Sequence, residues 1–361
     1  MPKFTPLIDS LPSSVPFVGP EALERRSGAV IKARIGANES VFGPAPSVIK
    51  AVQDHAGDSW MYGDPENHDL KYALAAHLNV APENICVGEG IDGLFSYTLR
   101  LFVERGVSVA TSHGAYPTFN FHALGFGGRL VTTPYVEDRE NPTSLLALAK
   151  TQKAGVIYFA NPDNPMGTVW PAPDVQRFID AVPDDMMLML DEAYSEFAEA
   201  STRPALDVEH KNVLRFRTFS KAYGLAGVRV GYVIGHAEVI KAFDKIRNHF
   251  GMPCLSQVAA LAALKDQAWL NHVVGEVKAA RERIYEIARA NGLKPIASAA
   301  NFVAVDCGRD DTYAGKIVDG LLNQGVFVRM PGVVPLNRCI RISAGTKQHL
   351  DVLADALPRV V

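Results

Sequence analysis

The sequence predicts an α/β protein with a mostly parallel central sheet flanked by helices, followed by a smaller α+β domain. From about residue 30 to residue 245, short apolar strands alternate with amphipathic helices, which is the pattern of repeated βαβ units. Beyond this point a long helical stretch precedes several short strands, an order typical of a separate α+β domain. The length of 361 residues also suits two domains better than one simple core.

These patterns divide the chain into three parts. Residues 1–30 contain five prolines and little periodicity, so we expect an irregular N-terminal arm that ends in a short helix near Glu21–Ser27. Residues 31–245 form the expected large domain, and residues 246–361 form the expected small C-terminal domain. The chain shows no internal repeat and no low-complexity tract.

The individual elements are expected where apolar runs have the period of a strand or of a helix. Strands of the large domain are predicted at Ser108–Thr111, Arg129–Thr132, Val156–Ala160, Met186–Leu190, Val213–Thr218 and Val230–Ile234. Its helices are predicted at Val48–His55, Asp69–Leu78, Leu94–Val103, Tyr116–Leu124 and Asp174–Ala181. The small domain should contain a helical region at Ser256–Ala290, strands near Phe302–Asp306, Val326–Arg329 and Cys339–Ile342, and a closing helix at Lys347–Leu357.

Composition argues against several classes of protein. Apolar residues make up 48% and charged residues 21%, an ordinary globular balance rather than a disordered one. A net charge of −3 gives no reason to expect nucleic acid or a membrane surface as a partner. The four cysteines are far apart, so they form no C-x-x-C metal or redox pair, and no apolar run suits a signal peptide or a membrane span. We therefore expect a cytoplasmic protein with reduced thiols and no metal.

A glycine-rich turn at Gly88–Gly93 matches the G-x-G-x-x-G pattern of dinucleotide-binding proteins. It follows the apolar Ile85–Val87 and leads into a helix, whose free N–H groups favour a phosphate. However, it lies well inside the chain, and no acidic residue follows the next strand to hold a ribose. An NAD-dependent dehydrogenase is therefore a remote alternative, and a plain tight turn is another.

Polar residues also stand at or just beyond the ends of three predicted strands. In chain order they are Asn164, Asp191, Tyr194, Ser220, Lys221 and Arg229. Open α/β sheets bind ligands at the carboxyl ends of their strands, so these side chains should meet at one edge. Each has an ordinary explanation when taken alone, such as a strand cap or a surface ion pair. The whole series in this order is much more specific.

This series resembles fold-type I pyridoxal-phosphate (PLP) enzymes, in particular class I/II aminotransferases, and is most similar to histidinol-phosphate aminotransferases. The likeness runs from about Arg34 to the C-terminus and is most specific over Arg217–Gly231. It implies the fold of PLP-dependent transferases and a homodimer. It also implies a ping-pong transaminase that moves an amino group between an L-amino acid, or histidinol phosphate, and a 2-oxo acid.

The resemblance assigns a role to each residue of the series. Lys221 would form a Schiff base with pyridoxal 5'-phosphate and act as base and acid. Asp191 would face the pyridine nitrogen and keep it protonated, which makes the ring an electron sink. Asn164 and Tyr194 would hydrogen-bond the phenolate oxygen. The phosphate would be held by Gly90, Ile91, Asp92, Thr218, Ser220 and Arg229.

Three further residues are assigned by the same likeness, and a fourth, Arg329, by its place twelve residues before Arg341. Tyr116 resembles the aromatic residue that stacks on the cofactor ring, with a core tyrosine as the alternative. Tyr62 resembles a tyrosine that reaches the cofactor phosphate of the partner subunit, which would make the active site shared. Arg341 resembles the arginine that binds the substrate α-carboxylate in a fork, with a structural ion pair as the alternative. Arg329 is a second cation for a phosphate or a distal carboxylate.

The chain departs from the family pattern near the expected substrate. Phe17 replaces a usual tyrosine, Asn38–Gly43 keeps the Asn-Glu pair but loses the usual residues after it, and Met166 replaces a usual threonine. Gly93 stands where an acidic residue is common. The substrate therefore stays open, and a PLP decarboxylase or lyase of the same fold would share the cofactor residues. A DNA-binding regulator is set aside, because about thirty residues before Arg34 cannot supply a second domain.

Overall fold

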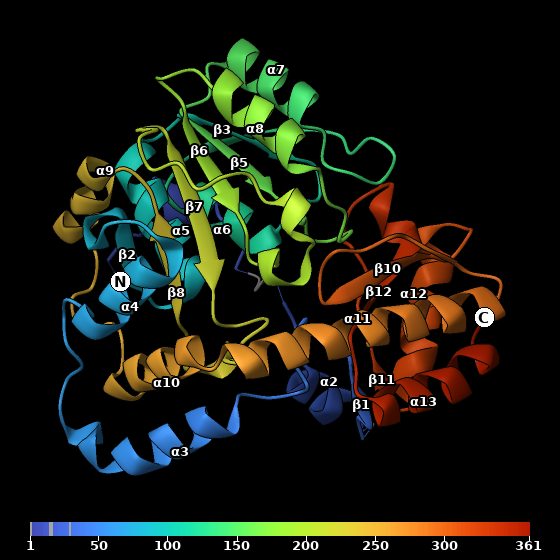
Figure 1. Cartoon of the computed structure of the whole chain (residues 1–361). Coiled ribbons are helices and arrows are strands. Elements are labelled where there is room, and N and C mark those ends of the chain that lie inside the picture. The colour runs from blue at the N-terminus through green and yellow to red at the C-terminus, as the bar shows by residue number, and fades with distance from the viewer. Residues whose placement is uncertain (1, 14–16, 29) are drawn as a thin grey trace.

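The computed structural model describes residues 2–13, 17–28 and 30–361, and its centre is a seven-stranded sheet (Figure 1). The strand order is β2-β8-β7-β6-β5-β3-β4. The strands are β2 (Ile85–Gly88), β3 (Ser108–Ser112), β4 (Arg129–Thr133), β5 (Val156–Ala160), β6 (Met187–Asp191), β7 (Val213–Thr218) and β8 (Gly231–Ile234). Only β8 runs against its neighbours, and the other pairings are parallel. The predicted α/β class is confirmed.

Helices cover both faces of this sheet, which explains why its strands are continuous apolar runs. The helices of this part are α3 (Pro46–His55), α4 (His68–Leu78), α5 (Gly90–Phe102), α6 (Pro117–Gly125), α7 (Pro142–Gln152), α8 (Ala172–Ala181) and α9 (Ala237–Ala242). Along β5 the side chains alternate between the faces. Tyr158 packs in the core with α5 and α6, whereas Ile157 and Phe159 pack with α7 and α8.

The C-terminal part has a smaller sheet of order β12-β10-β9, formed by β9 (Lys294–Pro295), β10 (Phe302–Asp306) and β12 (Cys339–Ser343). Helix α12 (Asp311–Asn323) packs against β12, and α13 (Lys347–Ala356) packs against α11 (Gln267–Ala290) in the same part of the chain. The short strand β1 (Ala33–Arg34) pairs in parallel with β11 (Val326–Phe327). This pairing places residues from near the start of the chain beside the C-terminal part. The segment after Arg34 follows directly from β1.

Two helices replace the single predicted helical region at Ser256–Ala290. Helix α10 (Cys254–Lys265) packs on α3 and α4, and α11 (Gln267–Ala290) continues to the C-terminal sheet, as Figure 1 shows. The break falls at Asp266, whose side chain caps α11 by accepting a hydrogen bond from the Trp269 N–H. The proposed domain boundaries at residues 30/31 and 245/246 stay a prediction.

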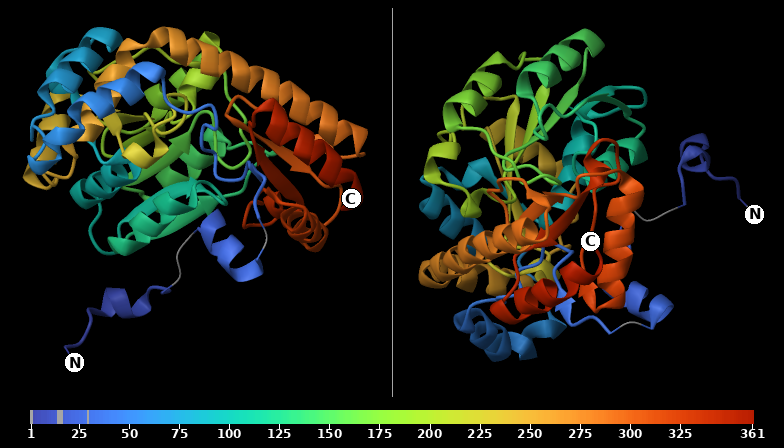
Figure 2. Two further views of the ribbon diagram at one scale, coloured as in Figure 1. Left: turned by 90° about the horizontal axis from the view of Figure 1, so that it is seen from below. Right: turned by 90° about the vertical axis from the view of Figure 1, so that its right-hand side faces the viewer.

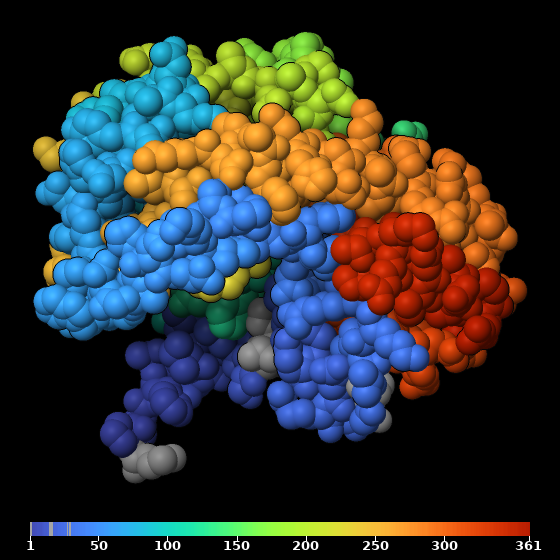
Figure 3. Space-filling model, turned by 60° about the horizontal axis from the view of Figure 1, so that its bottom comes forward, coloured from blue at the N-terminus to red at the C-terminus, as the bar shows by residue number. Residues whose placement is uncertain are grey.

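The N-terminal arm contains one predicted and one unpredicted helix. Helix α2 (Pro20–Ser27) matches the predicted one, and α1 (Pro6–Ser10) begins with Thr5 as its cap. No residue of α1 is buried, and the helix lies apart from the body of the molecule in Figures 2 and 3. The arm was also predicted to include residues 1, 14–16 and 29, which lie outside the described residues.

Helix α7 was not predicted, although its start carries two ordinary signals. The Asn141 side chain accepts a hydrogen bond from the Ser144 N–H, and Pro142 occupies the first turn. Its apolar face is narrow, because Leu145 and Ala149 are its main buried residues, so the periodic signal is weak. Within the described ranges, no helix has both the length and the apolar character needed to cross a bilayer.

Candidate active site

A cavity of about 430 Å³ lies at the carboxyl ends of β5, β6 and β7. Most of the predicted site residues line it, namely Ile91, Asp92, Tyr116, Asn164, Asp191, Tyr194, Thr218, Ser220, Lys221, Arg229, Arg329 and Arg341. Gly90 lies just behind this wall, and Tyr62 lies elsewhere. The remaining lining residues are Phe17, Ala37, Asn38, Glu39, Ala193 and Ala226. The strand-exit series thus meets at one edge of the sheet.

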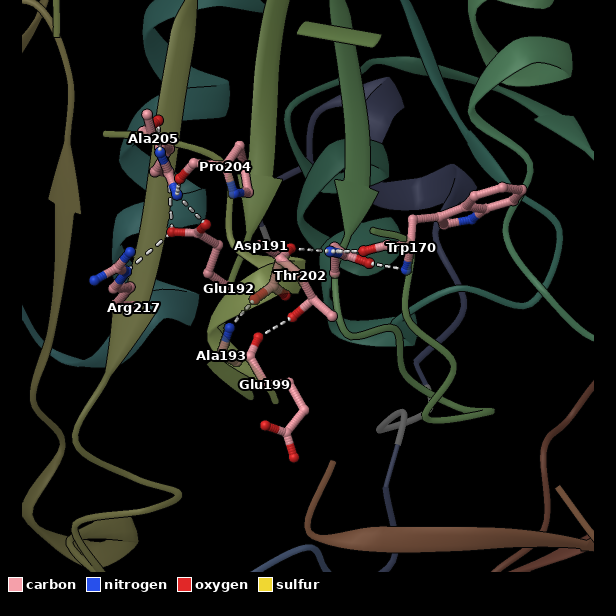
Figure 4. Close-up of polar contacts among 11 residues, drawn as sticks. Trp170, Asp191, Glu192, Ala193, Glu199, Thr202, Pro204, Ala205 and Arg217 are labelled. Carbon is pink, nitrogen blue, oxygen red and sulfur yellow. Dashed lines mark hydrogen bonds and ion pairs between the residues drawn. The ribbon is translucent and has the colours of Figure 1, made fainter. Parts of the chain in front are cut away.

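Asp191 ends β6 and is a buried carboxylate with two fixed donors. Its Oδ2 accepts a hydrogen bond of 2.6 Å from the Tyr158 hydroxyl. Its Oδ1 accepts one of 2.9 Å from the Ala193 N–H (Figure 4). Burial raises the pKa of Asp191 to about 6, although the two hydrogen bonds oppose the rise. Such a carboxylate, lining the cavity with no ion-pair partner among the described residues, suits a protonated ring nitrogen.

Lys221 brings an amine to the same cavity from the loop after β7. Its Nζ donates a hydrogen bond of 3.2 Å to the backbone oxygen of Asn38 and lies 5.6 Å from the centre of the Tyr194 ring. In the described part of the chain, no carboxylate forms an ion pair with this amine. An amine held by a neutral carbonyl stays free to react with an aldehyde.

Asn164 and Tyr194 form a linked pair beside Lys221. The Asn164 Nδ2 donates to the Tyr194 hydroxyl at 3.3 Å, and its Oδ1 accepts from Arg341 at 2.6 Å. Asp163 shapes the turn that carries Asn164, because one of its oxygens accepts from both the N–H and the hydroxyl of Thr168 at 2.6 Å. Burial raises the pKa of Asp163 to about 6. The turn therefore depends on a buried acid that was not among the predicted residues.

A group of hydrogen-bond donors converges where α5 begins. Gly90 has φ 75° and no side chain caps this helix, so its first N–H groups remain available. A Cβ on Gly90 would collide with the Arg229 guanidinium, which explains the need for glycine. Arg229 also donates to the Ser220 hydroxyl at 3.3 Å, and the Ser220 N–H donates to Thr218 at 3.0 Å. A helix N-terminus with a guanidinium and two hydroxyls suits a phosphate.

Tyr116 contacts the first turn of α5 through Asp92. Its hydroxyl donates to Asp92 Oδ2 at 3.4 Å, and its ring stacks at 6.3 Å on Phe17 of the N-terminal arm. Burial raises the pKa of Tyr116 above its usual value, so its hydroxyl stays a donor. The Asp92 Oδ1 is buried and has no hydrogen-bond partner among the described residues.

Arg341 brings a cation from β12, and Arg329 brings a second one from the segment after β11. Arg341 is 8% exposed, its Nε is buried without a hydrogen-bond partner in the described structure, and burial lowers its pKa to about 10. Arg329 pairs with Arg341 through the backbone, donates to the Val18 oxygen at 2.8 Å and lies over the Phe17 ring at 4.9 Å. Neither forms an ion pair within the described ranges, so the structural ion pair considered for Arg341 is absent there. Both remain available to an anion.

Tyr62 does not reach the cavity of its own chain. It is 79% exposed, and its ring packs against Phe250 with the centroids 4.8 Å apart. Its expected role in the site of a partner subunit stays a prediction.

Besides Asp163, the sequence reasoning missed two polar residues that shape the site. Tyr158 lies in the middle of an apolar strand, so no local pattern distinguishes it from a core tyrosine. Asn38 belongs to the family-like Asn-Glu pair, and this was the one available signal. Its position against Lys221 and Tyr194 depends on the fold of distant segments.

A buried ion cluster around Glu192, the residue after Asp191, lies outside the cavity lining. Glu192 is 2% exposed and accepts hydrogen bonds from Arg215 at 3.1 Å and Arg217 at 2.9 Å, part of the network in Figure 4. Arg215 also donates to the backbone oxygens of Pro204 and Ala205. Burial by itself would raise the pKa of Glu192, but the two arginines outweigh it and lower the pKa to about 2.

Replacing Glu192 with glutamine should therefore destabilise the protein by about 3 kcal/mol, because two buried guanidinium groups lose their counter-charge. The low pKa has a second consequence. Stability from Glu192 is fully present above its unfolded pKa of 4.5 and is lost as the pH falls toward about 2, so the wild type but not Glu192→Gln should show this contribution. Urea unfolding between neutral and acidic pH measures both effects. The exposed Glu209→Gln is the control, and equal stability of the two variants would contradict the prediction.

Comparisons with known proteins agree with this geometry. Residues 30–357 match the family model of class I and II aminotransferases. A histidinol-phosphate aminotransferase of Moorella thermoacetica is 31% identical over 100% of this chain and 94% of its own. Histidinol-phosphate aminotransferase 1 of Mesorhizobium japonicum is 32% identical over 94% of this chain and 93% of its own.

Solved structures give the same result. The histidinol-phosphate aminotransferase of Sinorhizobium meliloti, in complex with pyridoxal-5'-phosphate, superposes with a TM-score of 0.97 at 56% identity, covering 100% of this chain and 98% of that one. An aspartate aminotransferase of Thermus thermophilus has a TM-score of 0.82 at 24% identity and covers 100% of both chains, which shows the shared fold alone. The dehydrogenase, decarboxylase and lyase alternatives find no support in these matches.

The cavity meets the chemical needs of PLP at each of its ends. An amine, a buried carboxylate and a cup of phosphate donors all lie on its walls or directly behind them. The glycine-rich turn that matched a dinucleotide pattern supplies the start of α5 in that cup. Together with the match over residues 30–357, this shows that the chain belongs to the class I and II aminotransferases, enzymes that use pyridoxal phosphate.

Proposed function

We propose that the cavity residues hold PLP and that the enzyme moves an amino group from an L-amino acid, or histidinol phosphate, to a 2-oxo acid. The proposal depends on one observation: Lys221, Asp191 and a group of phosphate donors meet at a single cavity. These donors are Thr218, Ser220, Arg229 and the N–H groups at the start of α5, and we call them the Arg229 cup. When bound, PLP supplies an aldehyde that joins to amines and a ring that spreads the negative charge left on the neighbouring carbon. The large domain, residues 31–245, would carry most of these groups.

Lys221 is the residue we assign to covalent attachment and to proton transfer. A general base must lie within hydrogen-bond reach of the proton it removes, and the Lys221 Nζ is the amine of this cavity that meets both Asn38 and Tyr194. We assign to it removal of the proton from the substrate α-carbon and delivery of a proton to the cofactor carbon that would be bonded to the same nitrogen. The neutral Asn38 oxygen can hold the amine between these steps.

Asp191 is the residue we assign to the ring nitrogen. Its buried carboxylate would keep that nitrogen protonated, since a cation beside it stabilises the ionised acid. The hydrogen bonds from Tyr158 and Ala193 hold both of its oxygens in place. The Tyr116 ring is assigned to the face of the cofactor.

The phosphate of PLP is assigned to the donors around the start of α5. Arg229 would give a charge-assisted contact, and Thr218 and Ser220 would give hydroxyl donors. The backbone N–H groups of Gly90, Ile91 and Asp92 would complete the cup at the positive end of the helix.

The substrate side favours an anionic compound. Arg341 is assigned to the α-carboxylate of an amino acid, because its buried Nε still lacks an acceptor among the described groups. Arg329 is assigned to a second anion, such as a distal carboxylate or a phosphate ester. Phe17 and Val18 of the arm contact Arg329, and Phe17 lines this part of the cavity. Histidinol phosphate, the substrate named for the relatives, offers such a phosphate.

A half-reaction screen tests the proposed function. Purified holoenzyme is mixed with single amino acids or with histidinol phosphate, and the visible absorbance of the bound cofactor is followed. A true donor should remove that band and leave the aminated cofactor in stoichiometric amount, and a 2-oxo acid should restore the band. Release of carbon dioxide or pyruvate without the aminated cofactor would instead indicate a decarboxylase or a lyase.

We also propose a cytoplasmic homodimer in which Tyr62 reaches the phosphate of the partner's cofactor. Its support is the cluster of exposed aromatic side chains formed by Trp60, Tyr62 and Phe250, which a partner would cover. The cytoplasm is supported by four free cysteines.

Removing the Tyr62 hydroxyl should weaken PLP binding about tenfold, because a hydrogen bond to a charged phosphate is lost. Tyr62→Phe is compared with Tyr72→Phe, another exposed tyrosine, by cofactor titration of the apoenzyme. Sedimentation should show a dimer for both variants. A monomeric enzyme with full activity would refute the shared site.

A further inference from the structure

We propose that Asn38 is a positioning residue that directs the hydroxyl hydrogen of Tyr194 into the cofactor cavity. This inference rests on the proposed contact between Tyr194 and PLP. It concerns a side chain that the residue series at the strand exits does not include.

Asn38 has an unusual backbone and is almost fully enclosed. Its φ is 55°, in the left-handed region that asparagine tolerates better than most non-glycine residues, and it is 2% exposed. Its backbone oxygen accepts from Lys221 Nζ at 3.2 Å and from Asn301 Nδ2 at 3.1 Å. The residue therefore touches both the large sheet's loops and the C-terminal part of the chain.

The Asn38 carboxamide faces Ser343 with its oxygen and Tyr194 with its nitrogen. The Ser343 Oγ accepts a hydrogen bond of 3.0 Å from the Asn38 backbone N–H, so its own hydrogen is free to be donated. It donates that hydrogen to Asn38 Oδ1, also at 3.0 Å. The remaining end of the carboxamide, Nδ2, then faces the Tyr194 hydroxyl at 3.2 Å.

Arg341 sets the direction of the second amide in the same way. A guanidinium can only donate, so Arg341 fixes the Asn164 Oδ1 as the acceptor at 2.6 Å. The Asn164 Nδ2 is thereby left to donate to Tyr194 at 3.3 Å. Tyr194 thus receives two hydrogen bonds, which occupy both lone pairs of its oxygen.

The single hydrogen of Tyr194 must then point in a third direction. Neither amide nitrogen can accept it, and no other acceptor for it is found among the described residues. Tyr194 is buried and lines the cavity, so the remaining partner lies inside the cavity. Accepting two hydrogen bonds also polarises the O–H bond and makes it a stronger donor.

This orientation predicts a spectroscopic effect. A donor that faces an oxygen of the bound cofactor favours its negatively charged form, which lowers the pH midpoint of the cofactor's absorbance change. Without the Asn38 carboxamide, the Tyr194 hydrogen is no longer directed toward the cavity. The midpoint of the holoenzyme should then rise by about one pH unit.

Asn38→Gly is the main variant, since glycine accepts the left-handed backbone and keeps the carbonyl that contacts Lys221. Its holoenzyme is titrated without substrate, so activity plays no part in the measurement. Asn38→Ala is the matched control, because it loses the same carboxamide but adds backbone strain. Both should show the same midpoint, and the alanine variant should have the lower melting temperature of the two. Equal midpoints therefore separate the hydrogen bond from the strain.

A double-mutant cycle with Tyr194→Phe decides whether Asn38 acts through Tyr194. Tyr194→Phe by itself should raise the midpoint, and adding Asn38→Gly should then change nothing further. If Tyr194→Phe leaves the midpoint unchanged, the proposed cofactor contact of Tyr194 fails. If Tyr194→Phe shifts it but Asn38→Gly does not, or if the Asn38 effect persists without the hydroxyl, the positioning role is overturned.

Ser343→Ala offers an independent variant that leaves Asn38 in place. Losing the serine hydroxyl frees the carboxamide to turn over, so the midpoint should rise by a smaller amount than in Asn38→Gly. This variant also covers the case in which the glycine protein folds poorly. A midpoint equal to that of the wild type would contradict the proposed lock on the carboxamide.

Discussion

Replacing Lys221 with alanine is expected to lower the transamination rate by about ten-thousand-fold, the upper range for a positioned acid and base. The variant loses the amine that lies among Asn38, Tyr194 and the cavity wall. It should still bind PLP, because the Arg229 cup holds the phosphate independently. Steady-state rates and cofactor titration measure the two parts separately.

Borohydride reduction followed by peptide mass spectrometry provides the direct check on Lys221. The wild-type peptide should gain the mass of the cofactor at this residue, and the Lys221→Ala protein should gain none. Lys347→Ala, at a lysine whose side chain is 90% exposed on α13, is the control and should behave as the wild type. Labelling at another lysine in the wild type would remove the central assignment.

Replacing Asp191 with asparagine should lower the turnover by about a hundredfold to a thousandfold. Asparagine keeps the shape and can still accept from the Ala193 N–H, but it carries no charge to hold a proton on the ring nitrogen. The loss should appear in kcat more than in the substrate KM, because the charge acts on the reacting ring. Half-reaction kinetics with a single donor measure it.

Tyr158→Phe is the matched control for Asp191, because it keeps the carboxylate and removes only the 2.6 Å hydrogen bond. That bond lowers the pKa of Asp191, which burial has raised to about 6, so its loss should raise the pKa further. In the apoenzyme, where no ring cation opposes this rise, the ionisation midpoint of the Asp191 carboxyl should therefore move to higher pH by about one unit, as followed by NMR titration of that carboxyl. An unchanged midpoint would show that the Tyr158 hydrogen bond does not stabilise the ionised carboxylate.

The strand-exit residues were predictable because parallel strands place their carboxyl ends at one edge. Asn164, Asp191 and Lys221 each follow an apolar run, and such runs are recognisable without any knowledge of contacts. The glycine-rich turn was also recognisable, although its ligand was ambiguous. In the structure these segments line one cavity, as the sheet geometry requires.

Other features depended on contacts that no local pattern reveals. Tyr158 reads as one more apolar strand residue until β5 and β6 pair and bring it against Asp191. From the sequence alone Glu192 resembles a surface acid, because its two arginine partners on β7 are more than twenty residues away along the chain. The break at Asp266 was hidden because both flanking segments favour helix.

By itself, the sequence determined the fold class, the cofactor chemistry and the identity of the residues at the strand exits. The fold class and the strand-exit positions follow from periodicity and from residue types at strand ends, which are local properties of the chain, whereas the cofactor chemistry followed from the resemblance to a known family. Only the tertiary structure decided that Asn38 meets Tyr194, and that Arg341 lacks an acid partner in the described residues. The reason is physical, since hydrogen bonds between residues far apart in sequence form only when folding brings separate elements together.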